Sequence, residues 1–403
     1  MSTQVTAPPE DGAKPRPSAP RRLFSWMISG NTFTVTVLAF FSALVVGAVI
    51  IVLATPSAMT AWHYALVSPG TALSESWDAI TSAYGALLSG ALGSRQAISE
   101  TLVSTTPLLM AGLGVALAFR AGLFNIGGEG QLILGAMGAT WAGFSFRGLP
   151  ILVHLPLALL AGAVAGGAWA FIPGILKART GAHEVITSMM LNYVALNLLG
   201  WVLIQKEFCA TNPCTDAISK VVAQGSRLPH IAGSNLRVNL GIVLAVLFAI
   251  GVAWLLQRST LGFEFRMIGL NADAAGVAGV STKRLYVVVM TMSGMLVGLA
   301  GAFSVLGVDY QLSPAYGGTT GFDAITVAIL GHGSPLGVAL ASLLFGAFIS
   351  GGRAMQVSTG IPLQLVVVIQ AVLVLFVAAP GVIRTIYRIK VRRGAERVFG
   401  GWG

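Results

Sequence analysis

One short stretch of the sequence carries the side chains best suited to contacting a polar solute. Residues 118 to 139 read AFRAGLFNIGGEGQLILGAMGA and place Arg120, Asn125, Glu129 and Gln131 among glycines. A carboxylate and two amides offer donors and acceptors, and glycines loosen a helix so that backbone groups become available as well. The alternative is a cytoplasmic turn in which Arg120 and Glu129 are solvated or paired. We favour contact with a solute.

The elements that position these residues belong to a membrane. The chain has 403 residues, of which 55% are hydrophobic and 9% charged, whereas soluble domains carry about 25% charged residues. Its 50 glycines suit membrane helices, because small residues let such helices approach closely. The predicted fold class is all-α, a polytopic transmembrane helix bundle of about ten segments.

The net charge of +10 is concentrated near the two ends, so no nucleic-acid partner is expected. Basic clusters beside spans are typical of cytoplasmic ends, and the sequence therefore predicts both termini inside. Residues 1–30, rich in Pro, Ser and Ala, are predicted to be a disordered cytoplasmic tail. Residues 31–385 form the transmembrane domain, and residues 386–403 form a basic cytoplasmic tail.

Apolar runs predict the spans at 33–54, 100–119, 132–146, 151–176, 185–204, 238–256, 286–308 and 362–379. The interval 322–350 is divided at GHGSP, residues 331–335, into a short eighth segment and a ninth span, because a single crossing would leave the basic C-terminus outside. The amphipathic stretch 55–98 predicts a helix in the outer interface. Residues 205–237 are an outer loop holding Cys209 and Cys214, for which a disulfide and two unpaired thiols both remain open.

Two further polar positions within spans are candidates for the solute pathway. Asn192 lies within the fifth span, where interhelical hydrogen bonding is the simpler interpretation. Asp323 opens the eighth segment, which, like the stretch around Glu129, places a Gly-interrupted break before a further apolar run. Broken segments in corresponding positions of two halves indicate a binding pathway between them. The candidate pathway set is therefore Asn125, Glu129, Gln131, Asn192 and Asp323.

The sequence lacks the motifs of an independent ATP-driven pump. It contains no GxxxxGK[ST], HExxH or GxSxG pattern, so the chain cannot use ATP alone. Two cysteines are also too few for a structural zinc site, which takes about four ligands, and no metal site is expected. The classes of protein that remain compatible with the sequence are secondary carriers, channels, membrane enzymes and the permeases of multi-part transporters.

The charged interval 257–285 separates these classes. The sequence from 259 to 303, STLGFEFRMIGLNADAAGVAGVSTKRLYVVVMTMSGMLVGLAGAF, resembles the inner-loop signature of permeases of ABC importers for simple sugars, branched-chain amino acids and nucleosides. The resemblance implies a type II importer-like fold and a coupling helix that docks on an ATPase subunit. The residues that carry this signature are Gly262, Arg266, Gly269, Asn271, Ala274, Ala275, Ala278 and Gly279.

The substrate branch is indicated by LAFRAGLFNIGGEGQLILGA and GAHEVITSMMLNYVALNL, which resemble the nucleoside-type branch of these permeases. The resemblance implies a multi-pass protein of the bacterial plasma membrane, a second permease subunit, an ABC ATPase and an external solute-binding lipoprotein. ATP and magnesium would then belong to the ATPase, and no cofactor to this chain. The alternatives are a simple-sugar permease, or a secondary carrier whose ion site would use Glu129 and Asp323.

Overall fold

The computed structural model describes residues 32–211, 213–233, 235–316 and 318–388, and the regular secondary structure within them is helical, with two isolated β-bridges within residues 209–239. The tail predicted over 1–30 and most of the basic tail lie outside these residues. The first helices are α2 (Thr32–Ala54), α3 (Pro56–His63), α4 (Pro69–Leu92), α5 (Arg95–Arg120), α6 (Gly128–Ser145), α7 (Ile151–Thr180) and α8 (Glu184–Leu203). The later ones are α9 (Gly241–Arg258), α10 (Thr260–Leu270), α11 (Ala272–Val277), α12 (Thr282–Ser304), α13 (Thr320–Leu330), α14 (Pro335–Thr359), α15 (Leu363–Ala378) and α16 (Pro380–Ile386).

Ten of these helices correspond to the ten predicted segments. In the described chain, seven helices are long and apolar enough to cross a membrane, and the pair α15 and α16, bent by 89°, makes an eighth if it is one span. The predicted division at residues 331–335 is confirmed, because α13 ends at Leu330 and α14 begins at Pro335. Helices α6 and α13 are outside the set of full spans: α13 has only 11 residues, and the first turn of α6 is polar.

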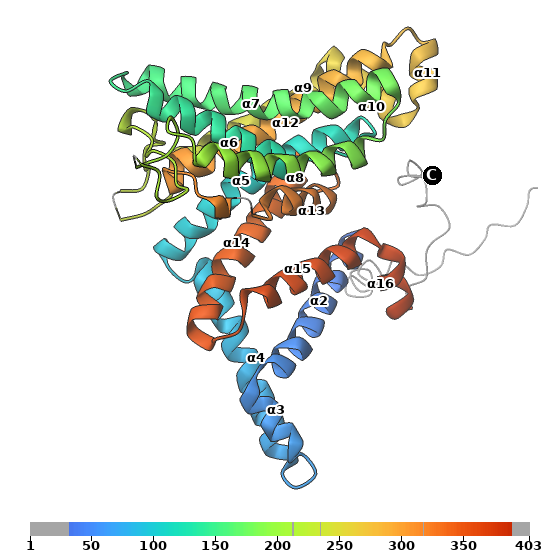
Figure 1. The fold of residues 1–403 in the computed structure, drawn as a ribbon. Helices are drawn as coiled ribbons and strands as arrows, with labels where there is room; N and C mark the ends of the chain where they lie inside the picture. The colour runs from blue at the N-terminus through green and yellow to red at the C-terminus, as the bar shows by residue number, and fades with distance from the viewer. Residues whose placement is uncertain (1–31, 212, 234, 317, 389–403) are drawn as a thin grey trace, which may run out of the picture.

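Small residues hold the main body together. A Cβ atom added at Gly298 of α12 would overlap the backbone of Gly162 and Gly166 in α7, and one at Gly135 of α6 would overlap the backbone of Gly298. Backbone contact of this kind gives membrane helices their van der Waals attraction. The motif SGMLVGLAGA therefore packs α12 against α6 and α7 in one body (Figure 1).

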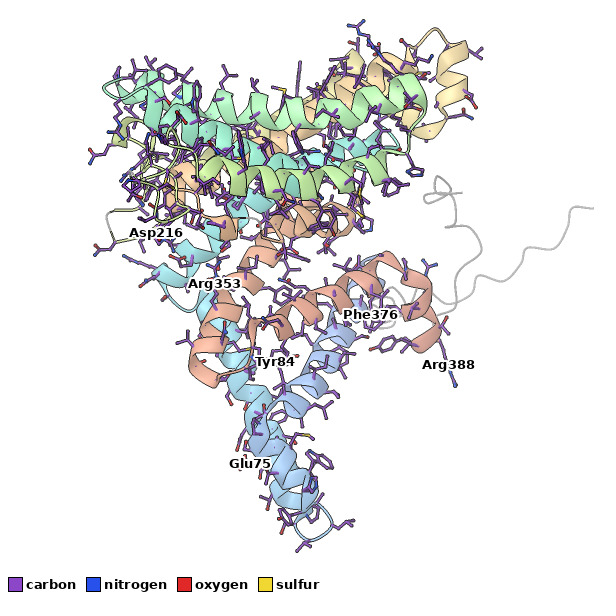
Figure 2. All side chains as sticks on the ribbon, viewed as in Figure 1. Glu75, Tyr84, Asp216, Arg353, Phe376 and Arg388 are labelled. Carbon is purple, nitrogen blue, oxygen red and sulfur yellow. A yellow bond between two sulfur atoms is a disulfide. The ribbon has the colours of Figure 1, made fainter. Side chains whose placement is uncertain are left out.

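Helices α2, α3 and α4 extend from this body as a limb, and α14 and α15 pack along it (Figure 1). Tyr84 of α4 donates to the Leu44 carbonyl of α2 at 2.6 Å (Figure 2). A Cβ atom at Gly351 of α14 would overlap the Leu87 carbonyl of α4. The amphipathic stretch thus forms a helix that packs on α14, and its placement in the outer interface stays a prediction.

The loop between α8 and α9 packs on the far end of α12. Cys209 and Cys214 form a disulfide in this loop, which resolves the alternative that the sequence left open. The backbone N–H of Ser219 donates to the Leu312 carbonyl at 2.9 Å, and that of Leu228 donates to the Leu306 carbonyl at 2.9 Å. This loop, which carries Asp216 (Figure 2), lies at the opposite end of the body from α10 and α11 (Figure 1).

Candidate functional site

The glycine-rich break between α5 and α6 is a buried, hydrogen-bonded structure. Asn125 and Gln131 exchange two side-chain bonds of 2.8 Å, and the Asn125 amide also donates to the Ser293 hydroxyl of α12 at 2.7 Å. The Asn125 oxygen accepts in addition from the backbone N–H of Gly127. Asn125 and Ser293 are fully buried, and Gln131 is nearly so. Paired amides satisfy groups that would otherwise be costly to bury.

Asn192 joins α8 to the same break. Its side-chain oxygen accepts from the backbone N–H of Gly130 at 2.8 Å, and its amide donates to the Ile126 carbonyl at 2.9 Å. The first of these bonds joins α8 to α6, which is the interhelical hydrogen bonding that the simpler interpretation of Asn192 predicted. Asn197, five residues along, is exposed and donates only to the Tyr193 carbonyl of its own helix.

Glu129 connects the first turn of α6 to the N-terminus of α13. One carboxylate oxygen accepts from the backbone N–H of Gly318 at 2.9 Å, and the other accepts from that of Gly321 at 2.8 Å. A Cβ atom at Gly321 would overlap the Glu129 backbone, so the two helix starts touch. Helix N-termini carry partial positive charge, and two of them stabilise this carboxylate, which is only 2% exposed.

We call the set Asn125, Glu129, Gln131, Asn192 and Ser293 the polar junction. The burial of Glu129 excludes a solvated carboxylate, one form of the alternative for this stretch, whereas Arg120 is exposed. The structure brings four of the five candidate pathway residues into the junction, whereas the Asp323 carboxylate accepts from the Thr319 hydroxyl at 3.0 Å. Ser293 was not a candidate, although it begins the quoted SGMLVGLAGA motif.

Arg120 links the two Gly-interrupted breaks that resemble each other in the sequence. Its Nε donates to the Gly333 carbonyl, in the break between α13 and α14, at 2.9 Å. The backbone of Arg120 packs against Gly269 of α10, so closely that a Cβ atom at Gly269 would overlap the Arg120 carbonyl oxygen. Only glycine at 269 permits this approach. The last residue of α5 therefore contacts both the second break and the interval 257–285.

Within that interval, most signature residues shape the segment itself. Asn271 caps α11 by accepting from the backbone N–H of Asp273 and Ala274, each at 3.0 Å. Arg266 donates to the Leu256 carbonyl at the end of α9. A Cβ atom at Gly262 would overlap the backbone at the end of α9. These residues set the direction of α10 and α11 relative to α9.

The exposed face of the segment differs from the predicted docking face. Ala274, Ala278 and Gly279 are exposed, but Ala275 is only 1% exposed and packs inward. Ala275 is therefore corrected from a docking residue to a packing residue. Two apolar side chains that sequence reasoning missed point outward instead, Leu270 at 83% and Val277 at 92% exposure. No signal in the sequence distinguishes them from the other apolar residues of this interval, such as Leu261, Phe265 and Ile268.

Together, these features define a helical protein with several candidate membrane spans and a short exposed helical segment, α10 and α11, at one end. Residues 97–378 match the family model described as the permease component of the branched-chain amino acid transport system. The chain belongs to this family of ABC transporter permeases. Helices α2 to α4 precede the matched residues.

Three curated relatives cover most of the chain. A guanosine ABC transporter permease of Bacillus subtilis is 40% identical over 325 residues, covering 79% of this chain and 91% of the relative. A nucleoside ABC transporter permease of Lactococcus lactis is 37% identical, covering 74% and 84%. A glucose ABC transporter permease of Haloferax volcanii is 35% identical, covering 78% and 85%. No solved structure matches the chain.

Proposed function

We propose that this ABC permease imports nucleosides. The observation that carries the proposal is the 40% identity with a guanosine permease over 91% of that relative's length, supported by the 37% identity with a nucleoside permease. The relative named for glucose, at 35% identity, keeps a sugar as the second candidate substrate. As in other permeases of this type, the chain itself would carry out no chemical reaction.

Three partners follow from the proposal. An ATPase subunit, which binds ATP and magnesium, docks on α10 and α11, where Leu270 and Val277 are exposed. We call these two helices the docking segment. A second permease subunit completes the pathway, and an external lipoprotein delivers the solute at the end that carries the disulfide loop. Both chain ends would then lie in the cytoplasm.

A continuous series of contacts supports coupling between the docking segment and the polar junction. Gly269 of α10 touches the backbone of Arg120, and the Arg120 side chain bonds to Gly333 just after α13. At its other end, α13 is bonded to Glu129. A shift of the docking segment would therefore reach both ends of α13, a short rigid element whose two sides are bonded to different helices.

A secondary carrier would need Glu129 free to bind an ion or proton with Asp323. Both oxygens of Glu129 accept from backbone N–H groups of 318 and 321, and Asp323 bonds to Thr319 in its own first turn. Because the two carboxylates have separate partners, this geometry favours the ABC permease over the carrier.

The test is uptake by proteoliposomes that contain this chain, its second permease and its ATPase, supplied with the external binding protein. We expect ATP-dependent uptake of radiolabelled guanosine and little uptake of glucose. A matched preparation with an ATPase unable to hydrolyse ATP is the control. ATP-dependent glucose uptake without nucleoside uptake would replace the proposed substrate with a sugar.

A further inference from the structure

A polar cavity of about 390 Å³ lies beside the polar junction, toward the disulfide loop. Its wall is formed by the end of α12, the segment 309–316 and the start of α13, and Leu132 of α6 contributes from the junction side. Ligand pockets in proteins occupy roughly 300–1,000 Å³. The volume is therefore at the lower end of the range for small-molecule sites.

The polar side chains of the wall are Ser304, Asp309, Gln311, Ser313, Tyr316 and Thr320. Within the described residues, no hydrogen bond or ion pair engages the side chains of Asp309 or Gln311. The junction is the opposite case, because Asn125, Glu129, Gln131 and Asn192 are all bonded to protein groups. Donors and acceptors available to a solute are thus on the cavity wall and not in the junction.

The backbone that presents Asp309 is irregular and firmly held. Residues Val305–Asp309 form a π-helical turn at the end of α12, a feature that is frequent at functional sites. The next residue, Tyr310, has a left-handed φ of 57°, and Arg227 lies over its ring at 4.5 Å. The backbone N–H of Val222 in the outer loop also donates to the Tyr310 carbonyl. These contacts fix the backbone directly after Asp309, at the rim of the cavity.

The charge of the wall restricts the ligand. Among the eight residues that line the cavity, Asp309 is the one charged group, and none is Lys, Arg or His. A phosphate or carboxylate ligand would meet a like charge on the wall itself, and the nearest cations that act on Asp309, Arg237 and Arg353, lie outside the wall. A neutral ligand with adjacent hydroxyl groups suits the site, because a carboxylate can accept from two neighbouring O–H donors.

From this geometry we propose that the cavity is a solute site of the permease, in which Asp309 accepts from the two ribose hydroxyls of an unphosphorylated nucleoside. Gln311, Ser313 and Thr320 supply the remaining polar contacts. The inference rests on the proposed function, since it assigns the ligand class within nucleoside transport. The polar junction then closes the inner end of the site, because Gly318 and Gly321 bond to Glu129 beside the wall residue Thr320.

The test compares uptake of guanosine with that of 2′,3′-dideoxyguanosine by the complete transporter in proteoliposomes. The same external binding protein is used with every variant. Its own preference between the two solutes therefore contributes equally to the wild type and the variants, and cancels in the comparison. We expect Asp309→Asn to reduce the wild-type preference for guanosine by about tenfold, the factor that corresponds to 1.4 kcal/mol. Asp216→Asn removes a carboxylate from the outer loop outside the cavity wall and should leave the preference unchanged. Guanosine 5′-monophosphate should not compete with guanosine in the wild type.

A second variant covers the case in which Asp309→Asn does not assemble. Ala315 is exposed on the wall, so Ala315→Trp should fill the cavity without disturbing the helices and should reduce guanosine uptake by more than about tenfold. An unchanged preference in Asp309→Asn, or normal uptake by Ala315→Trp, overturns the cavity assignment alone. Failure of the wild type to transport any nucleoside overturns the proposed function instead, together with the ribose ligand.

Discussion

The polar junction and the docking segment use similar residue types in opposite ways. Both combine glycines with asparagine and a charged side chain, yet the junction is buried and its side chains are bonded internally. The docking segment is exposed, its capping groups serve its own helices, and its large apolar side chains Leu270 and Val277 face outward. A buried polar group without a partner is costly, whereas an exposed apolar patch marks a binding surface.

The comparison teaches that a polar break in a membrane protein is not by itself a solute site. The junction amides hold α6, α8 and α12 together, so their loss should affect folding first. Residues of the docking segment should affect assembly with the ATPase while leaving the permease folded. Four substitutions test this division, from the largest expected effect to the smallest.

The largest effect is expected for Asn125→Leu. The change removes the bonds to Gln131, Ser293 and Gly127 and leaves buried polar groups unsatisfied, at about 1–3 kcal/mol each. We expect a loss of about 3 kcal/mol or more, measured as a lower midpoint of thermal unfolding in detergent. The matched control is Asn197→Leu, whose exposed amide bonds only within its own helix and should cost less than about 0.5 kcal/mol. Equal shifts in the two variants would contradict a structural role for the junction.

The next effect concerns the contact between α6 and α13. In Glu129→Gln, one carboxylate oxygen becomes an NH2 group, which cannot accept from Gly318 or Gly321. Losing a charged hydrogen bond of about 1.5–3 kcal/mol should lower transport-linked uptake by about tenfold or more at equal expression. The control Asp323→Asn changes a carboxylate bonded only to Thr319 and should change uptake less than about twofold. Normal uptake in Glu129→Gln would show that the α13 contact is not needed for transport.

Val277→Arg probes the docking surface. A long charged side chain at a position that is 92% exposed leaves the permease folded but obstructs an apolar contact. We expect about a tenfold loss of ATPase subunit in co-purification, equivalent to 1.4 kcal/mol, with an unchanged unfolding midpoint. Ala275→Leu should instead lower the unfolding midpoint, because Ala275 is buried and overpacking costs about 1–3 kcal/mol. Retention of the ATPase by Val277→Arg would place docking elsewhere.

The smallest effect is expected for Asn271→Ala. This substitution removes the N-cap that accepts from Asp273 and Ala274, and such a loss costs about 1 kcal/mol. The effect should be local, seen as faster amide hydrogen exchange in Ala272–Val277 with the global unfolding midpoint unchanged. A global shift as large as that of Asn125→Leu would remove the distinction between the two regions.

The sequence alone determined the class and the segment order of this protein. Long apolar runs set the membrane spans, the basic excess at the C-terminus required the division at 331–335, and the motif from 259 to 303 indicated the ABC permease family. These features are local, because a span or a docking motif is written in consecutive residues. The candidate residues Asn125, Glu129, Gln131 and Asn192 were also recognisable as polar groups within membrane segments, although the sequence favoured contact with a solute for the first three of them.

Only the tertiary structure decided what those residues contact. Asn125 meets Ser293, which is 168 positions away, and Glu129 meets Gly318 and Gly321, which are 189 and 192 positions away. Hydropathy describes the surroundings of a residue along the chain, whereas hydrogen bonding depends on which helices pack together. The same limit applies to Ala275, whose inward direction depends on how α11 folds back toward α12. Whether a polar side chain is bonded within the protein or open to a solute is therefore a property of the packed helices.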